Sequence, residues 1–322
     1  MMDDPFECFG SSSDEESIDE NIAKKNSGTA NKNGSAHLPQ PARETENGVM
    51  SFHSGVEDAL FLHVSKLLKD QAGGRDMENS QFISKASEVL SAIDNFCKDK
   101  YWMMHIGDVK GKILQGALKK SFKVYTINSP ERFVAVELGT YCGYSAVMIG
   151  DTLRNNFSAL GSNESSHHRA HLYSVEVDQM HAQRARKMVS LARLDDWITI
   201  IESFDCEDAI ERIKELEQRN TSLDLSNIDF LFIDHDKDLY TSDLQLIERE
   251  GLLKKGSIVV ADNVLWAYIT NYIDYVQLKA KKGVVETKTV ECPVEYSENE
   301  MDEVGFERLK DGIEITTYLS NP

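Results

Sequence analysis

The stretch FVAVELGTYCGYS, residues 133–145, decides the fold. Its first four residues are apolar, which predicts a short buried strand that ends at Glu137. Gly139 and Gly143 then let the backbone turn sharply and approach a ligand closely, and a helix is expected from about Gly143. A buried strand, a glycine turn and a helix together form the opening unit of an α/β fold.

The same unit recurs along the rest of the chain. Further buried strands are predicted at 172–175, 198–201, 228–233 and 257–261, with a helix at about 178–192. Strands separated by helical segments require right-handed crossovers, so we predict a doubly wound α/β fold with a mostly parallel sheet. Residues 284–292 and 312–319 are predicted to add two antiparallel strands at one edge.

The N-terminal part of the chain differs in composition. Residues 1–55 are poor in large apolar residues and contain the acidic run Ser11–Glu16, so we predict a disordered acidic tail. This tail is either a spacer or a phosphorylated or partner-binding segment. Amphipathic helices are expected from Val56, at 80–100 and at about 110–121, and residues 56–322 are predicted to form one domain. The polar stretch 155–169 is predicted to be a loop.

The composition limits the classes of function. The 322 residues carry 35 Lys+Arg against 54 Asp+Glu, a net charge of −19. Such a charge disfavours nucleic acid and anionic membranes, and fits a small-molecule enzyme or a protein-binding module equally well. The five cysteines are odd in number and widely spaced, which indicates a reducing compartment. We find no apolar run of membrane-spanning length and no secretory signal, so we predict a cytoplasmic protein, with the nucleus left open.

Acidic residues stand at the ends of the predicted strands, at Glu137, Glu176, Asp234 and Asp262. Ligands of an open parallel sheet bind beyond the carboxyl ends of its strands. One such carboxylate could simply cap the next helix. Because four occur in succession, the pattern favours a binding site.

The loop after Glu137 indicates the kind of cofactor. It lacks the G-x-G-x-x-G pattern that holds a pyrophosphate, which argues against a nicotinamide oxidoreductase. A glycine loop that opens with an acid suits a cationic ligand without phosphate, such as S-adenosylmethionine, which carries an ammonium and a sulfonium. Glu176 is placed to accept the ribose hydroxyls of such a nucleoside.

The fourth and fifth strand ends predict a metal site. If these strands are neighbours, Asp234, Asp262 and Asn263 converge, and their oxygens suit Mg²⁺. The absence of a cysteine or histidine cluster disfavours zinc. His235 is expected to form hydrogen bonds or to stack rather than to bind the metal. Lys237 is a candidate general base, because a nearby divalent cation disfavours its charged form.

Taken together, these motifs resemble the catechol O-methyltransferase family. The stretch 102–112 is similar to its lid, 137–145 to its cofactor loop, 234–238 and 261–263 to its metal and base motifs, and 294–296 to a substrate-binding segment. The resemblance covers about residues 58–322. It implies a Rossmann-like, class I, S-adenosylmethionine-dependent and cation-dependent O-methyltransferase.

The resemblance also implies a role for each matched residue. Lys237 and Glu295 would be catalytic, and Asp234, Asp262 and Asn263 would bind the metal. Substrate contacts would come from Trp102, Met104, Lys237, Asn263 and Glu295. Cofactor contacts would come from Ile106, Glu137, Gly139, Tyr141, Tyr144, Ser145, Glu176, Asp234 and His235.

The chain departs from the family pattern at several positions. Asp236 stands where the family has a tryptophan that encloses the cofactor, and His105 stands for an asparagine. A family proline that walls the catechol slot falls near Ala267. An acidic insertion, Ser297 to Glu303, follows Glu295.

The function expected is methyl transfer from S-adenosylmethionine to a Mg²⁺-chelated catechol or related vicinal diol, by a monomer active in catecholamine metabolism. Two alternatives stay open. One is a catalytically silent relative that acts as a binding or regulatory protein, and the other is an O-methyltransferase for a phenol that is not a catechol.

Overall fold

The computed structural model describes residues 43–44, 50–51, 55–71, 86–122, 132–158, 169–222, 224–296 and 310–322. The chain divides into two compact units, Met1–Met103 and Met104–Pro322. Within the described ranges, no helix is both long and apolar enough to cross a membrane. Most of the predicted tail 1–55 lies outside the described residues, and so does 159–168 of the predicted loop.

The first unit contains two short strands and two helices. Strands β1 (Arg43–Glu44) and β2 (Met50–Ser51) pair antiparallel. Helices α2 (Val56–Gln71) and α3 (Ala86–Asp99) contact each other, with the rings of His63 and Phe96 5.3 Å apart. Both helices were predicted, although the expected start of the second, 80–85, lies outside the described residues.

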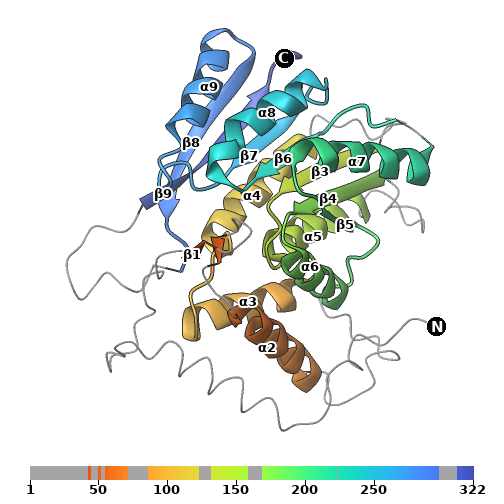
Figure 1. Ribbon diagram of the computed structural model, residues 1–322, viewed down its shortest axis with the longest axis vertical. Coiled ribbons are helices and arrows are strands. Elements are labelled where there is room, and N and C mark those ends of the chain that lie inside the picture. Colours follow the sequence, from red (N-terminus) through yellow and green to blue (C-terminus); the bar gives the residue numbers. More distant parts are fainter. Residues whose placement is uncertain are drawn as a thin grey trace. The chain divides into compact units, whose positions relative to one another are not determined.

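The second unit is built on a seven-stranded sheet in the order β5-β4-β3-β6-β7-β9-β8 (Figure 1). Its strands are β3 (Phe133–Leu138), β4 (Ala170–Glu176), β5 (Ile198–Glu202), β6 (Phe230–Ile233), β7 (Ile258–Ala261), β8 (Val285–Pro293) and β9 (Lys310–Tyr318). Strands β3 to β7 pair in parallel, and β9 runs antiparallel to both β7 and β8. The predicted Rossmann-like α/β fold with an antiparallel edge is confirmed.

Helices cover both faces of this sheet (Figure 1). They are α4 (Gly107–Phe122), α5 (Tyr144–Ser158), α6 (Gln179–Leu191), α7 (Cys206–Thr221), α8 (Tyr240–Arg249) and α9 (Thr270–Lys281), with a short 3-10 helix η2 (Lys237–Leu239) before α8. Helix α5 contacts α4 and α6, and α8 contacts α7 and α9. Apolar residues of α7, α8 and α9 pack with alternate residues of the strands, including Val134, Val136, Leu231, Ile233 and Val259, to form a buried core.

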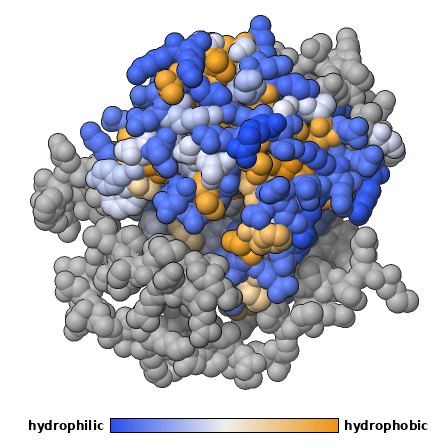
Figure 2. Space-filling view, turned by 45° about the horizontal axis from the view of Figure 1, so that its top comes forward, coloured by the Kyte–Doolittle hydropathy of each residue, from blue (hydrophilic) through white to orange (hydrophobic). Residues whose placement is uncertain are grey.

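The surface of the molecule agrees with its composition. The face shown in Figure 2 is mostly hydrophilic, and its apolar residues occur in small groups between charged ones. Isolated apolar residues on a protein surface are common.

Two predicted boundaries were wrong. Helix α5 continues to Ser158, so residues 155–158 are helical rather than part of a loop. Asn155 and Asn156 remain in the helix because their side chains donate to Asp151 Oδ2 and to the Thr152 carbonyl, one turn earlier. Strand β6 begins at Phe230 instead of residue 228, because the Asp229 carboxylate accepts the Val134 amide at 2.8 Å before the β6 ladder starts.

The order in which strands are added to the sheet reverses between β3 and β6, which are parallel neighbours. From β3 the chain continues to β4 and β5 on one side, and later from β6 to β7 on the other. Gly139 follows β3 with φ +97°, and a Cβ atom there would lie 2.3 Å from the Asp234 carbonyl oxygen. Only glycine permits this contact between two backbones, which brings the loop after β3 against the end of β6.

We expect Gly139→Ala to lower the free energy of unfolding by about 2–5 kcal/mol, because strain at positive φ adds to backbone overlap. Urea unfolding followed by circular dichroism measures the change. Gly116→Ala is the matched control, since Gly116 lies within helix α4 and a Cβ atom there meets nothing within 4 Å. An equal stability of the two variants would show that the close approach at Gly139 is unimportant.

Candidate active site

The predicted acidic residues meet at the carboxyl edge of the sheet. Glu137 is the second-last residue of β3, and Glu176 is the last residue of β4. Ile233 of β6 is paired with Ala261 of β7, so Asp234 and Asp262, the next residue of each strand, lie side by side. Neighbouring strands are about 4.8 Å apart, which puts the two carboxylates within reach of a common ion.

Glu137 is fully buried, and its two oxygens have different surroundings. Ser174 donates a short hydrogen bond to Oε2, while Oε1 has no hydrogen-bond partner among the described residues. Burial raises the pKa of Glu137 to about 8. The nearby hydroxyls of Ser145 and Ser174 oppose this rise, and repulsion from Asp234 adds to it. A buried acceptor without a donor is unfavourable, so this position suits a cationic ligand group such as an ammonium.

Glu176 connects β4 to the glycine loop. One oxygen of its carboxylate accepts the Tyr141 amide at 2.7 Å, and the other accepts the Asp178 amide at 3.0 Å. Burial raises the pKa of Glu176, and these two backbone hydrogen bonds oppose that rise. The cap of helix α6 is Asp178, not Glu176. Each carboxylate oxygen keeps a lone pair that a ligand hydroxyl could use.

Aromatic rings surround the glycine loop. The ring of His105 lies 5.2 Å from that of Tyr141 and stacks at 5.5 Å on that of Tyr144. The ring of His181 meets Tyr141 edge-on at 4.9 Å. The sequence showed His105 only as a departure from the family, whereas the structure places it, with buried Ile106, beside the predicted cofactor loop.

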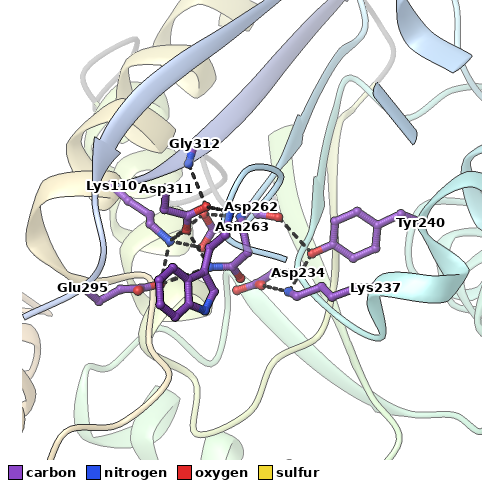
Figure 3. Close-up of polar contacts among 10 residues, drawn as sticks. Lys110, Asp234, Lys237, Tyr240, Asp262, Asn263, Glu295, Asp311 and Gly312 are labelled. Atoms are coloured by element: carbon purple, nitrogen blue, oxygen red, sulfur yellow. Dashed lines mark hydrogen bonds and ion pairs between the residues drawn. The ribbon is translucent and has the colours of Figure 1, made fainter. Parts of the chain in front are cut away.

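Lys237 lies next to one predicted metal ligand. Its Nζ is 2.8 Å from Asp234 Oδ1 and 2.8 Å from the Tyr240 hydroxyl oxygen. The Tyr240 hydroxyl in turn donates to the Asp262 carbonyl at 3.3 Å. Figure 3 shows Lys237 and Tyr240 on one side of Asp234, with Asp262 and Asn263 on the other.

His235 points to helix α8. Its Nε2 is 2.7 Å from Asp243 Oδ2, and its ring stacks on Tyr240 at 5.3 Å with an interplanar angle of 13°. Hydrogen bonding and stacking are the roles that the sequence suggested for this residue. Its neighbour Asp236 caps the 3-10 helix η2, where its side chain accepts the Asp238 amide at 3.0 Å.

Lys110 and Asp311 lie at the centre of the site, and sequence reasoning missed both. The Nζ of Lys110 is 3.0 Å from Asp262, 2.6 Å from Glu295 and 2.5 Å from Asp311 (Figure 3). Asp311 also accepts the Asn263 side-chain amide at 2.9 Å. A lysine within the predicted helix at about 110–121 was visible in the sequence. Its burial and its three carboxylate partners are visible only in the folded structure.

These contacts set the charges of the site. Burial, together with repulsion from Asp234, Glu295 and Asp311, raises the pKa of Asp262 to about 8, although Lys110 opposes this. Burial favours the neutral form of Lys110, but its three carboxylate neighbours outweigh burial and hold its pKa well above the usual value. For Asp311 burial is outweighed by Lys110 and by backbone hydrogen bonds, which lower its pKa.

The chemistry of this donor set fits a divalent cation. Within the described ranges, no group of three or more His, Cys, Asp or Glu side chains forms a metal cage. The predicted site instead combines two carboxylates, Asp234 and Asp262, with the amide of Asn263. The Asn263 nitrogen donates to Glu295 and Asp311, so its oxygen faces away from them. Repulsion between the acidic groups is relieved by a cation, and oxygen ligands suit Mg²⁺.

The remaining predicted substrate residues, Glu295, Met104 and Trp102, do not all lie in one compact unit. Glu295 follows β8 and belongs to the Lys110 cluster, while Met104 is half-buried. A recess lies between two segments, Ile106 to Lys110 and Pro293 to Tyr296. Trp102 belongs to the first unit, so its predicted role stays a prediction. The insertion from Ser297 to Glu303 lies outside the described residues.

Comparisons with known proteins find relatives among methyltransferases. A family model described as a methyltransferase domain matches residues 136–264. The chain is 30% identical to a catechol O-methyltransferase from Bos taurus over 236 residues, 73% of this chain and 71% of that protein. It is 35% identical to catechol O-methyltransferase B from Danio rerio over 189 residues, 59% of this chain. The match spans 61% of the Danio rerio protein, about three fifths of its length.

Solved structures support the fold. The O-methyltransferase TomG from Streptomyces achromogenes, determined in complex with SAM, superposes with a TM-score of 0.51 and 15% sequence identity, over 72% of this chain and 90% of that one. At this level of identity, the likeness shows a common fold.

Proposed function

Because the chain belongs to the catechol O-methyltransferase family, we propose that it transfers a methyl group from S-adenosylmethionine to a catechol or related vicinal diol bound with Mg²⁺. The observation that carries the proposal is the convergence of Asp234, Asp262 and Asn263 at the ends of two paired strands, with Lys237 in contact with the first of them.

The glycine loop and its neighbours form the proposed cofactor site. Glu137 offers the ammonium of the methyl donor a buried oxygen that accepts no hydrogen bond from the described residues. Glu176 holds the ribose hydroxyls while it fixes the backbone at Tyr141. The predicted set of cofactor contacts is completed by Ile106, Gly139, Tyr141, Tyr144, Ser145, Asp234 and His235.

The proposed reaction depends on alignment of the two substrates. When bound, Mg²⁺ supplies Lewis-acid polarisation of the acceptor oxygens. Lys237 takes the proton of one hydroxyl, and Glu295 holds the other. The oxygen then forms a bond to the methyl carbon as the carbon–sulfur bond breaks, and the sulfide leaves. Holding the reacting atoms in line provides up to about 7–11 kcal/mol of the barrier reduction.

A methylation screen tests the proposal. Catechols and monophenols are incubated with S-adenosylmethionine, with Mg²⁺ or with EDTA, and the methylated products are quantified by mass spectrometry. We expect catechol methylation in Mg²⁺ and its loss in EDTA. Activity on monophenols that is equal in EDTA would contradict the proposal. Cofactor binding without turnover of any acceptor would favour the silent, regulatory alternative.

The cofactor assignment predicts a specific effect of Glu176→Gln. The introduced amide nitrogen must face the amide of Tyr141 or Asp178, both donors, and the charged acceptor for the ribose is lost. A hydrogen bond to a charged group contributes about 1.5–3 kcal/mol, so the Kd for S-adenosylmethionine should rise roughly 10- to 100-fold in isothermal titration. Glu202→Gln, at the paired position of β5, is the control and should change the Kd less than about twofold.

A further inference from the structure

We propose that the buried ion pair between Lys110 and Asp311 positions the ligands of the magnesium site, an inference that rests on the proposed function. Both side chains are at most 1% exposed, and their charged atoms are 2.5 Å apart. Neither residue matches a predicted catalytic, metal or cofactor position. Together they contact all three of Asp262, Asn263 and Glu295.

Lys110 uses its whole ammonium group on these contacts. An ammonium has three N–H donors, and three carboxylates surround this one, those of Asp262, Glu295 and Asp311. No donor remains for a substrate. Lys110 is therefore a positioning residue that holds the carboxylates of Asp262 and Glu295 in fixed places.

Asp311 sets the orientation of the Asn263 side chain. Its Oδ2 accepts Lys110 Nζ and, at 2.9 Å, Asn263 Nδ2. A carboxylate only accepts hydrogen bonds, so the nitrogen of the Asn263 amide must face Asp311 and the oxygen must face away from it. That oxygen is the atom that a hard cation binds. The backbone at Asn263 has φ 57°, which further fixes this geometry.

The same carboxylate anchors the loop that follows Asn263. Asp311 Oδ1 accepts the Trp266 amide at 3.0 Å and the Gly312 amide at 2.7 Å. A single side chain of β9 thus holds a predicted metal ligand and the loop beside it. A buried ion pair contributes little net stability compared with apolar residues of the same volume, so placement of the ligands is the better explanation of this pair.

Asp311→Asn tests the inference without a change of side-chain volume. All four partners of Asp311 are donors, so the introduced amide nitrogen must face a donor on one side. We expect the Mg²⁺ affinity, measured by isothermal titration with the metal alone, to fall roughly 10- to 100-fold. The affinity for S-adenosylmethionine should change less than about twofold, because Glu137 and Glu176 are untouched.

A matched control separates positioning from general stability. Glu217 is another buried carboxylate, paired with Arg132 at 2.8 Å beside the amino end of β3, away from the site. Glu217→Gln should lower the melting temperature but leave the Mg²⁺ affinity unchanged. If Asp311→Asn behaves in the same way, the pair is only structural and the inference is wrong.

Lys110→Met separates positioning from charge. Loss of the positive charge would by itself tighten cation binding. Asp262 and Glu295 would, however, no longer be held in place by the ammonium, and this loss of positioning weakens cation binding. We expect weaker Mg²⁺ binding in this variant as well, although its charge change is opposite to that of Asp311→Asn. Tighter binding would overturn the inference, and the test with Asp311→Asn stands even if Lys110→Met does not fold.

Measurements on the wild-type protein distinguish a failure of the proposed function from a failure of the inferred role of the ion pair. If it binds Mg²⁺ and methylates catechol while both variants bind Mg²⁺ equally well, only the role of the ion pair is wrong. If the wild-type protein binds no Mg²⁺, the proposed function falls and the inference falls with it.

Discussion

Asp262→Ala should lower kcat/KM for catechol methylation on the order of 1,000-fold or more. A bound metal contributes several kcal/mol to stabilisation of the transition state, and about 1.4 kcal/mol corresponds to a factor of ten in rate. Asp262 is buried and lies directly beside Asp234, the other predicted carboxylate ligand. Initial rates at saturating S-adenosylmethionine measure the loss, and isothermal titration shows whether cofactor binding is retained.

Chelation provides the decisive control for this variant. EDTA should lower the wild-type rate to the level of Asp262→Ala, and should change the rate of the variant little, because the two perturbations remove the same interaction. If EDTA lowers both rates by the same factor, Asp262 acts independently of the metal and the proposed mechanism is wrong.

The sequence predicted the sheet and its acidic edge because both depend on local patterns. Each buried strand is a short apolar run, and the acid follows it directly, as Asp234 follows Phe230–Ile233. The ends of parallel strands share one edge whatever their exact register. Asp234 and Asp262 were therefore expected to meet if their strands were neighbours, and the pairing of Ile233 with Ala261 supplies that condition.

The Lys110 cluster could not be predicted in the same way. Lys110 and Asp311 are 201 residues apart, and each belongs to a segment whose local pattern says nothing of its partner. A lysine in a helix is usually exposed, so its burial depends on the packing of α4 against the edge strands. Helix α7, for which no range was predicted, has a local cap, since the Asp205 side chain accepts the Asp208 amide.

Lys237→Met should lower kcat about 100- to 10,000-fold, the usual contribution of a general base. Methionine keeps the apolar stem of the side chain but cannot accept a proton. The affinities for Mg²⁺ and S-adenosylmethionine should stay within a few-fold of wild type, because the hydrogen bonds of Lys237 Nζ to described residues go to Asp234 and Tyr240. Single-turnover rates at saturating catechol separate the chemical step from binding. Lys214→Met is the control, since Lys214 forms an exposed ion pair with Glu250 at 2.7 Å.

Lys237→Arg distinguishes a base from a fixed positive charge. Arginine keeps the cation and the hydrogen-bond donors, but it stays protonated at every accessible pH and cannot take a proton from the acceptor hydroxyl. If Lys237 is the base, arginine should lower kcat roughly 100-fold or more, close to the loss in Lys237→Met. If arginine restores most of the rate, the site needs only a charge beside Asp234. The proton must then leave by another route, and the Tyr240 hydroxyl, 2.8 Å from Lys237 Nζ, would be the first group to test.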